Sequence, residues 1–540
     1  MEIIEINLAL MLAVAAIAAL GRWLPVPLPL LHIGGGIVLC FVPGFGRVHI
    51  NPDIFFLLFI PPLLFADGWM MPKRDLKAVL RPVLILAFGL VLATVVIVGY
   101  VMHLLIPSLP LAAAFALGAI VSPTDAVATA AMTERLPLPS RITLILNGES
   151  LINDASGLVA FKFAVAAVAT GVFSLSTAAG ELVLVACGGL VAGVAVAWIV
   201  GATRVGLKRV CIDDPTIETT LSLLTPFAAY LVAEQVHVSG ILAVVAAGLY
   251  AGWHDARHIS TITRQRATEV WEMLLFVFNG LVFLLLGLTL PNAISALAAT
   301  QSWTMLTGLA LALWLVVTLI RVVWVYPGTY LPRALSRKIR EQEPRPSQDA
   351  VFVVGWAGLR GSVTMAAALS IPVATEAGAA FPGREMIVFL SATTIILTLL
   401  INGLTLPRLI RAFGLHGDGN AEREQRAAEI AVAQAAAAAI SAEIGKLARP
   451  EERRFAEGLL VQYEMRVARH TANAERRREL DRTENVHRRI WLIGIQAERD
   501  ELATLRDQGV INEETVRTLE PRIDHAELVV TVVSRGRGHG

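Results

Sequence analysis

The sequence predicts an all-α polytopic membrane protein with about thirteen transmembrane helices, inverted repeats, two discontinuous crossing helices and a helical cytoplasmic tail. Only 16% of the 540 residues are charged and 55% are hydrophobic, with a mean hydropathy of +0.65, whereas a soluble domain of this size carries more charge. The charges are sparse as far as Leu406 and dense after it, which separates a membrane domain over residues 1–410 from a tail over residues 411–540. The net charge of +1 does not favour a nucleic-acid partner.

Apolar segments long enough to cross a bilayer, about 17–25 residues each, follow one another from the N-terminus. The first begins almost at once, without a basic region or a cleavage site, and is interpreted as a membrane helix and not as a signal peptide. The segments lie at about 3–21, 28–43, 53–71, 80–106, 110–132, 141–170, 179–203, 217–235, 238–253, 268–290, 303–331, 350–372 and 385–407.

Basic residues gather in the loops on one side of this alternation, whereas the other side carries Arg47 and Arg384. Because Lys and Arg collect in cytoplasmic loops, we expect the N-terminus outside the cell (inner) membrane and the tail in the cytoplasm. The basic loops carry Arg22, Lys73, Arg74, Lys77, Arg81, Arg135, Arg141, Arg204, Lys208, Arg209, Arg257, Arg264, Arg266, Arg333, Arg337, Lys338, Arg340 and Arg345.

Two of the segments are interrupted in the middle. The fifth contains Ser122-Pro123-Thr124-Asp125, where proline breaks the helix and leaves carbonyls and the Thr124 hydroxyl free to face a cation beside Asp125. The twelfth contains Gly355-Trp356-Ala357-Gly358-Leu359-Arg360-Gly361-Ser362. Interrupted helices in corresponding parts of two halves are typical of secondary transporters with a site at the membrane midplane. A simple proline kink and close glycine packing are the alternatives.

The segment at 141–170 carries two carboxylates at membrane depth, which are costly there without partners or a function. Ser150 and Asp154 share one helix face, and Glu149 and Asn153 share the adjoining face. We interpret Asp154 as a site for a small cation or a proton. The alternative is a set of structural hydrogen bonds between helices.

Arg360 needs a partner, because a guanidinium keeps its charge at any depth. An ion pair with Asp154 would block the cation, so we expect a structural ion pair between Glu149 and Arg360 that joins the sixth and twelfth segments. Its net contribution to stability is expected to be near zero, because desolvation offsets the attraction.

Other polar residues receive lesser roles. Asp67 lines an inward funnel or, alternatively, lies at the water boundary. Lys162 is expected to extend to the interface, and Arg321 is expected to anchor its segment there. His237 and Asn279 are interpreted as satisfied interior groups. No catalytic motif or cofactor motif is present, so we expect no enzyme and no cofactor.

The tail is expected to be helical over residues 421–446, because Ala, Glu and Gln are strong helix formers. Pro450 interrupts this pattern, which resumes to about Asp507, and a short helix follows Asn512. A regulatory or dimer-stabilising role and a plain ordered appendage both fit this pattern.

Four motifs in order, Pro61–Trp69, Ser122–Val127, Gly148–Asp154 and Gly358–Gly361, resemble those of sodium/proton exchangers of the first cation/proton antiporter family, the NhaP/NHE-type branch. The resemblance implies that residues 1–410 form an exchanger domain with core and dimerisation parts, and that the protein is a homodimer. It implies that Asp154 binds the ion with Ser150, Thr124 and the region of Asp125, while Asn153 shapes the site. The pair Asn153-Asp154, in place of two aspartates, resembles the electroneutral type.

The expected activity is therefore exchange of Na+ for H+ in pH and sodium homeostasis, with the cation and the proton alternating on Asp154. K+/H+ exchange is the nearest alternative, because Thr, Ser and Asp ligands do not fix the ionic radius, and Li+ is a further cation of this class. A gated cation channel and a membrane receptor that signals through the tail are alternatives of other classes.

Overall fold

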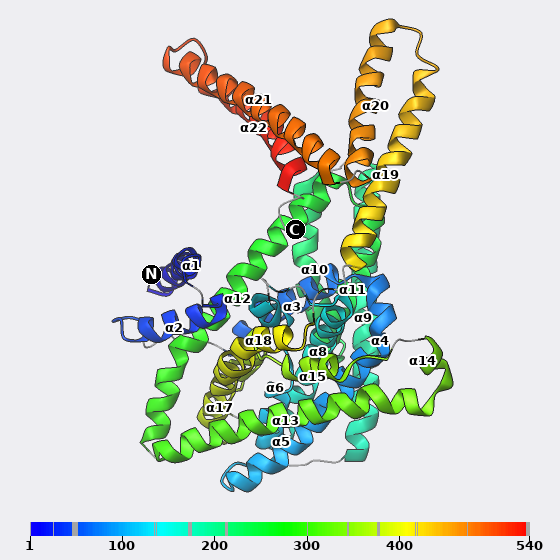
Figure 1. Cartoon of the computed structure of the whole chain (residues 1–540). Coiled ribbons are helices and arrows are strands. Elements are labelled where there is room, and N and C mark those ends of the chain that lie inside the picture. The colour runs from blue at the N-terminus through cyan, green and yellow to red at the C-terminus, as the bar shows by residue number, and fades with distance from the viewer. Residues whose placement is uncertain are drawn as a thin grey trace. The chain divides into compact units, whose positions relative to one another are not determined.

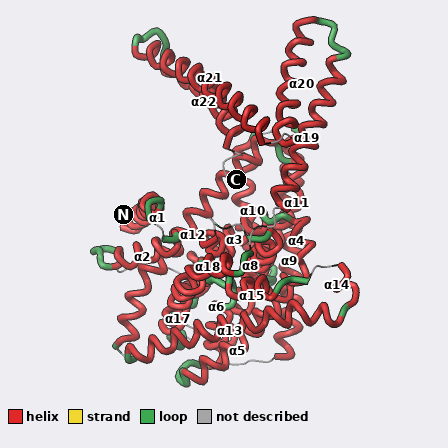
Figure 2. Tube along the Cα trace, in the orientation of Figure 1, coloured by secondary structure: helices red, strands yellow, loops and turns green. Residues whose placement is uncertain are grey.

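The computed structural model describes residues 2–24, 26–45, 52–133, 136, 138–170, 175–210, 214–299, 301–342, 345–374, 379–415, 417, 420–471 and 474–535. The basic-loop residue Arg135 and the opposite-side residue Arg47 lie outside these ranges. The chain forms two compact units, Met1–Asp418 and Gly419–Gly540. The described residues form helices and no strand, so the prediction of an all-α fold is confirmed (Figure 2).

The first unit is an assembly of α-helices with two π-helical stretches, η1 and η2 (Figure 1). Its elements are α1 (Glu2–Gly21), α2 (Leu28–Cys40), α3 (Pro52–Met70), α4 (Lys73–Leu84), η1 (Ile85–Leu90), α5 (Val91–Leu105), α6 (Leu111–Val121), α7 (Ala126–Thr133), α8 (Ser140–Thr170), α9 (Leu175–Arg209), α10 (Pro215–Gln235), α11 (Gly240–His258), α12 (Thr261–Ala298), α13 (Trp303–Leu335), α14 (Arg337–Gln342), α15 (Gln348–Trp356), α16 (Ser362–Leu369), α17 (Arg384–Leu397), η2 (Thr398–Gly403) and α18 (Leu404–Ala412).

Eight helices among the described residues are long and apolar enough to cross a membrane, and nine if α6 and α7, bent by 41° at their break, form one span. The other predicted segments correspond to further apolar helices. These are α1 with 20 residues, α2 with 13, α3 with 19 and α11 with 19, and the twelfth segment is divided into α15 and α16 by non-helical residues 357–361. One of the eight is Arg423–Ile444, in the second unit, whose hydropathy derives largely from alanine.

Glycines allow the closest backbone contacts around the broken helices. A Cβ atom on Gly157 of α8 would lie 2.6 Å from Cγ of Pro123, so α8 packs directly on the break between α6 and α7. Helices α2 and α12 also touch backbone to backbone, because a Cβ on Gly36 would lie 2.9 Å from Cα of Gly287. Gly157 leaves room for the ring of Pro123, and Gly36 and Gly287 let two helix backbones meet without side chains between them.

The described residues of the second unit form four helices, α19 (Asn420–Ile444), α20 (Pro450–Thr471), α21 (Ala474–Asp507) and α22 (Glu513–Arg535). Helix α19 packs against α20, and α21 packs against α22. Arg499 of α21 links the second pair, since its Nη2 lies 2.6 Å from Asp524 and 2.7 Å from Glu527 of α22. The predicted helices are present, but the last one is 23 residues long and not short.

Candidate ion-binding site

The two helix breaks cross each other inside the first unit. The backbone N–H of Asp125 donates to the carbonyl of Leu359 at 2.8 Å, and the Thr129 hydroxyl donates to the carbonyl of Ala357 at 3.2 Å. Residues 122–125 therefore pair with residues 357–361, although they are far apart in the sequence. The crossing places two helix N-termini, those of α7 and α16, beside one another in the buried interior.

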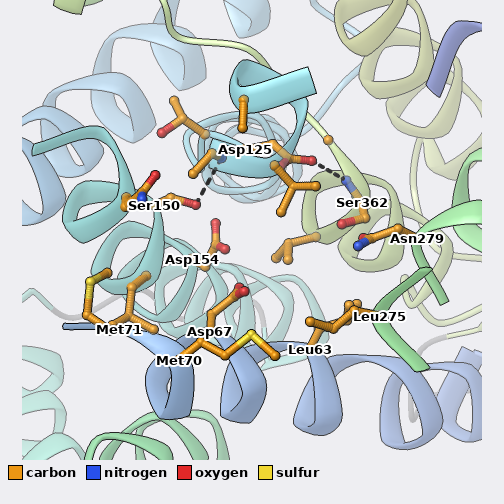
Figure 3. A pocket seen from close by; sticks show the side chains of 18 of the residues that line it. Leu63, Asp67, Met70, Met71, Asp125, Ser150, Asp154, Leu275, Asn279 and Ser362 are labelled. Carbon is orange, nitrogen blue, oxygen red and sulfur yellow. Dashed lines mark hydrogen bonds between the residues drawn. The ribbon is translucent and has the colours of Figure 1, made fainter. Parts of the chain in front are cut away.

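Asp125 caps both of these N-termini. Its Oδ1 accepts from the N–H of Ala128 in α7 at 2.9 Å, and its Oδ2 accepts from the N–H of Ser362 in α16 at 3.3 Å (Figure 3). Free N–H groups and the helix dipole both favour a carboxylate at such an end. The fit is so close that a Cβ atom on Gly361 would collide with the Asp125 carboxylate. The carboxylate therefore holds the crossing together as well as facing the cavity.

Ser150 of α8 contributes to the same arrangement. Its hydroxyl oxygen accepts from the N–H of Ala126, the first residue of α7, at 3.3 Å (Figure 3). Asn153 lies one turn further along α8, and its Nδ2 donates to the Thr124 hydroxyl at 2.8 Å. The Thr124 hydroxyl lies 3.4 Å from Oε1 of Glu149. Helix α8 is thus joined to the α6–α7 break by a chain of polar side chains.

The expected ion pair between Glu149 and Arg360 is wrong. Glu149 forms a bidentate pair with Arg321 of α13, in which Nη2 lies 2.8 Å from Oε2 and Nη1 contacts Oε1. Both side chains are 1% exposed. Arg321 also donates to the carbonyl of Val354 in α15. The expectation that Arg321 is an interfacial anchor is therefore also wrong, because α13 has 33 residues and sequence position alone does not give depth in so long a helix.

Arg360 is held by backbone carbonyls. Its Nε donates to the carbonyl of Val121, the last residue of α6, at 2.9 Å, and its Nη1 donates to the carbonyl of Gly358 after α15. The interrupted helices leave carbonyls without partners at these ends, and a cation is favourable there. Asp125 and Arg360 thus neutralise the N-terminal and C-terminal ends of the breaks, respectively.

A cavity of about 250 Å³ opens beside the crossing. Thr124, Asp125, Ser150, Asp154 and Asp67 line it, so the structure brings five predicted site residues together (Figure 3). Asn153 is not among the lining residues. Asp67 comes from α3, and the cavity extends past it to Met71 and Pro72 of the α3–α4 loop.

The three carboxylates of the cavity differ in their partners. Asp125 accepts backbone hydrogen bonds, whereas no hydrogen bond or ion pair to the Asp154 or Asp67 carboxylate occurs within the described ranges. Asp154 is 3% exposed. A buried carboxylate without a donor is costly unless it carries a proton or a cation. The arrangement is therefore suited to reversible binding of a small positive charge at Asp154.

Three of the lesser assignments are wrong. Asn279 of α12 is not satisfied by the protein in the part of the chain described, and it lines the cavity (Figure 3). His237 is exposed in the turn before α11, with a φ of 57°. Lys162 is 37% exposed and pairs with Glu234 of α10 at 2.5 Å, so it does not simply extend to the interface.

A bundle of membrane helices with two interrupted helices that cross beside buried carboxylates defines a secondary transporter. The family model described as "Sodium/hydrogen exchanger, transmembrane" matches residues 9–412. The chain belongs to this sodium/hydrogen exchanger family, whose members are multi-pass membrane transporters and not enzymes. The resemblance seen in the four sequence motifs is thereby confirmed.

Curated relatives agree with this placement. The chain is 40% identical over 413 residues to the "Sodium, potassium, lithium and rubidium/H(+) antiporter" of Bacillus pumilus, covering 75% of this chain and 61% of that protein. It is 38% identical over 547 residues to the "Uncharacterized Na(+)/H(+) exchanger YjcE" of Escherichia coli, covering 98% and 99% of the two chains.

A solved structure shows the same fold. The sodium proton antiporter MjNhaP1 from Methanocaldococcus jannaschii at pH 8 aligns with a TM-score of 0.57 and 19% identity, covering 76% of this chain and 98% of that one. At this identity the likeness establishes the fold alone.

Proposed function

We propose that this protein is an antiporter that exchanges Na+ for H+ across the cell membrane, with Asp154 as the carboxylate that binds the two in turn. The observation that carries the proposal is the Asp154 carboxylate, which is 3% exposed, lines the cavity and lacks a hydrogen-bond donor within the described residues. An ionised Asp154 binds the cation, and protonation releases it. The empty, charged site crosses the membrane poorly because a bare buried charge is costly, and this penalty couples the two fluxes.

The same residues assign roles to the rest of the site. Ser150, Thr124 and Asp125 supply oxygen atoms around Asp154, and Asn153 shapes the site by fixing the Thr124 hydroxyl. Asp67 stands in the part of the cavity that leads to the α3–α4 loop and attracts cations towards the site. One cation exchanges for one proton on a single carboxylate, so the cycle is electroneutral.

The membrane arrangement is part of the proposal. Residues 1–410 form the exchanger domain with about thirteen spans, because described helices overlap each of the apolar segments. The two crossing breaks support inverted repeats. The basic loops favour an N-terminus outside and a cytoplasmic tail over residues 411–540, with α19 outside the membrane. The homodimer rests on the family resemblance.

The identity of the cation has one competing candidate. The relative from Bacillus pumilus, and one from Bacillus subtilis that is 35% identical over 538 residues, carry potassium as well as sodium in their names. K+/H+ exchange at the same site is therefore the second candidate function, and it uses the same mechanism.

The test is cation-driven dequenching of a pH-sensitive dye in proteoliposomes, with Na+, K+ and Li+ added in turn. We expect Na+ to move protons with the wild type and no signal with Asp154→Asn. The matched control is Asp75→Asn, the same substitution at an exposed carboxylate of α4, which should exchange as the wild type does. Exchange by Asp154→Asn at the wild-type rate would refute the assignment, and a larger K+ signal would select the second candidate.

A further inference from the structure

The cavity has two walls that come from different parts of the fold. Thr124, Asp125, Ser150, Asp154 and Ser362 belong to the broken helices and α8. Asn147 of α8 and Thr364 of α16 line the same side. The polar residues of the other wall are Asp67 of α3 and Asn279 of α12 (Figure 3). The cation in this cavity therefore has protein ligands available on the wall that does not carry Asp154.

Asn279 is the neutral polar group of that wall. It lies inside Thr261–Ala298, a helix of mean hydropathy 2.5 in its most apolar window, where a side-chain amide is unfavourable without a partner. No hydrogen bond of its side chain to protein occurs among the described residues. Figure 3 shows the side chain on the cavity side of α12, near Ser362. Its hydrogen-bonding partner must therefore come from the cavity.

The wall that carries Asn279 is tied to α2. Helix α12 meets α2 at Gly287 and Gly36 with their backbones in contact, as described above, and a Cβ on Gly287 would lie 2.9 Å from Cα of Gly36. The Asp154 carboxylate belongs instead to α8, which packs on the α6–α7 break through Gly157. A movement of α8 and the broken helices relative to α12 would separate Asp154 from Asn279.

We propose that Asn279 is a specificity-determining residue that offers its amide oxygen to the cation when the cavity faces the α3–α4 loop. This inference rests on the proposed function and adds a ligand to the same site. An amide oxygen attracts a cation but does not bind a proton under physiological conditions, so it stabilises only one of the two occupants of Asp154. Asn279 therefore favours cation over proton at the site, and it does so from one face of the membrane.

The experiment compares Asn279→Val with Asn279→Thr, which have nearly the same shape and differ in that Thr carries a hydroxyl where Val carries a methyl group. Sided vesicles are prepared in both orientations, and the face that exposes the tail to protease is identified. At that face we expect Asn279→Val to raise the KM for the cation about tenfold, the scale of one lost hydrogen-bonding ligand of a charged group, with kcat changed less than about twofold. Asn279→Thr should restore part of the affinity, and the KM at the opposite face should not change.

Leu275→Val is the control, because Leu275 lines the same wall one helical turn earlier and carries no polar atom. Equal KM values for wild type and Asn279→Val, equal effects at both faces, or equal values for the Val and Thr variants would each overturn the inference. If Asn279→Val does not reach the membrane, Asn279→Thr alone decides. The Thr side chain is shorter than that of Asn, so its oxygen lies farther from the cation. The KM for Na+ should therefore rise relative to the KM for K+, and an unchanged ratio of the two KM values refutes the proposal.

This outcome is separable from the proposed function. Wild-type exchange together with a silent Asp154→Asn supports the exchanger mechanism whatever the Asn279 variants show. A wild type that does not exchange cations for protons removes the basis of both proposals at once.

Discussion

Replacement of Glu149 by Gln should destabilise the first unit, because it leaves the Arg321 guanidinium buried without its counter-charge. Both side chains of this pair are 1% exposed, and the guanidinium contacts both carboxylate oxygens. Removing one partner of a buried ion pair costs about 3–5 kcal/mol. At roughly 1–2 °C per kcal/mol for a unit of this size, the apparent Tm should fall by about 3–10 °C.

The assay is thermal unfolding of the detergent-solubilised protein, followed by tryptophan fluorescence, for a double-mutant cycle. Arg321→Met should lower the apparent Tm about as much as Glu149→Gln. The double variant should recover most of the loss, because replacing a buried pair by uncharged groups is close to neutral.

The same cycle with Arg360→Met is the control. Arg360 contacts the carbonyls of Val121 and Gly358 and makes no ion pair with Glu149, so Arg360→Met should recover much less of the loss than Arg321→Met does. Recovery of Glu149→Gln by Arg360→Met, and not by Arg321→Met, would refute the pairing and restore the partner expected from the sequence.

Three further changes test the crossing and its surroundings. Gly361→Ala should abolish folded protein, seen as loss of the monodisperse peak in size-exclusion chromatography, because the new Cβ collides with the Asp125 carboxylate. Asp125→Ala should cost about 1–3 kcal/mol from two lost helix caps, and Asp125→Asn should cost less, because it keeps an acceptor; equal apparent Tm values for the two variants would contradict the capping role. Lys162→Met should change stability by less than about 1 kcal/mol, because its pair with Glu234 is partly exposed; a larger loss of Tm would show that this contact is more important than its exposure indicates.

The sequence predicts the helical class and the two breaks well, because both depend on local chemistry. Long apolar runs require helices in a membrane, and Pro123 and the glycines around Arg360 weaken the helix locally. Such residues do not always break a helix, since Gly34, Gly35 and Gly36 lie inside α2. The number of spans is less accessible to this reasoning. The apolar segment at 28–43 folds as the 13-residue α2, and the segment at 350–372 is divided into α15 and α16, so hydropathy alone does not give their spanning length.

The sequence does not determine which arginine pairs with Glu149. Glu149 needed a buried cation, and both Arg360 and Arg321 were present, but only the packing of α13 against α8 and α15 distinguishes them. The interpretation of Asn279 as a satisfied interior group is wrong for a related reason. A lone amide in an apolar run indicates an interior position. Only the structure shows that this amide faces a cavity and has no hydrogen-bonding partner among the described residues.

The contrast between Asp125 and Asp154 suggests how a membrane protein uses two buried carboxylates for different purposes. Asp125 receives N–H donors from α7 and α16, and these bonds stabilise its charge and fix its position. Asp154 receives none within the described residues, so its charge depends on whatever enters the cavity. A carboxylate that the backbone already satisfies gains little from a passing cation, whereas an unsatisfied one gains most from it. In the proposed mechanism, Asp125 and Arg360 cap the crossing, so that Asp154 can remain without a fixed partner.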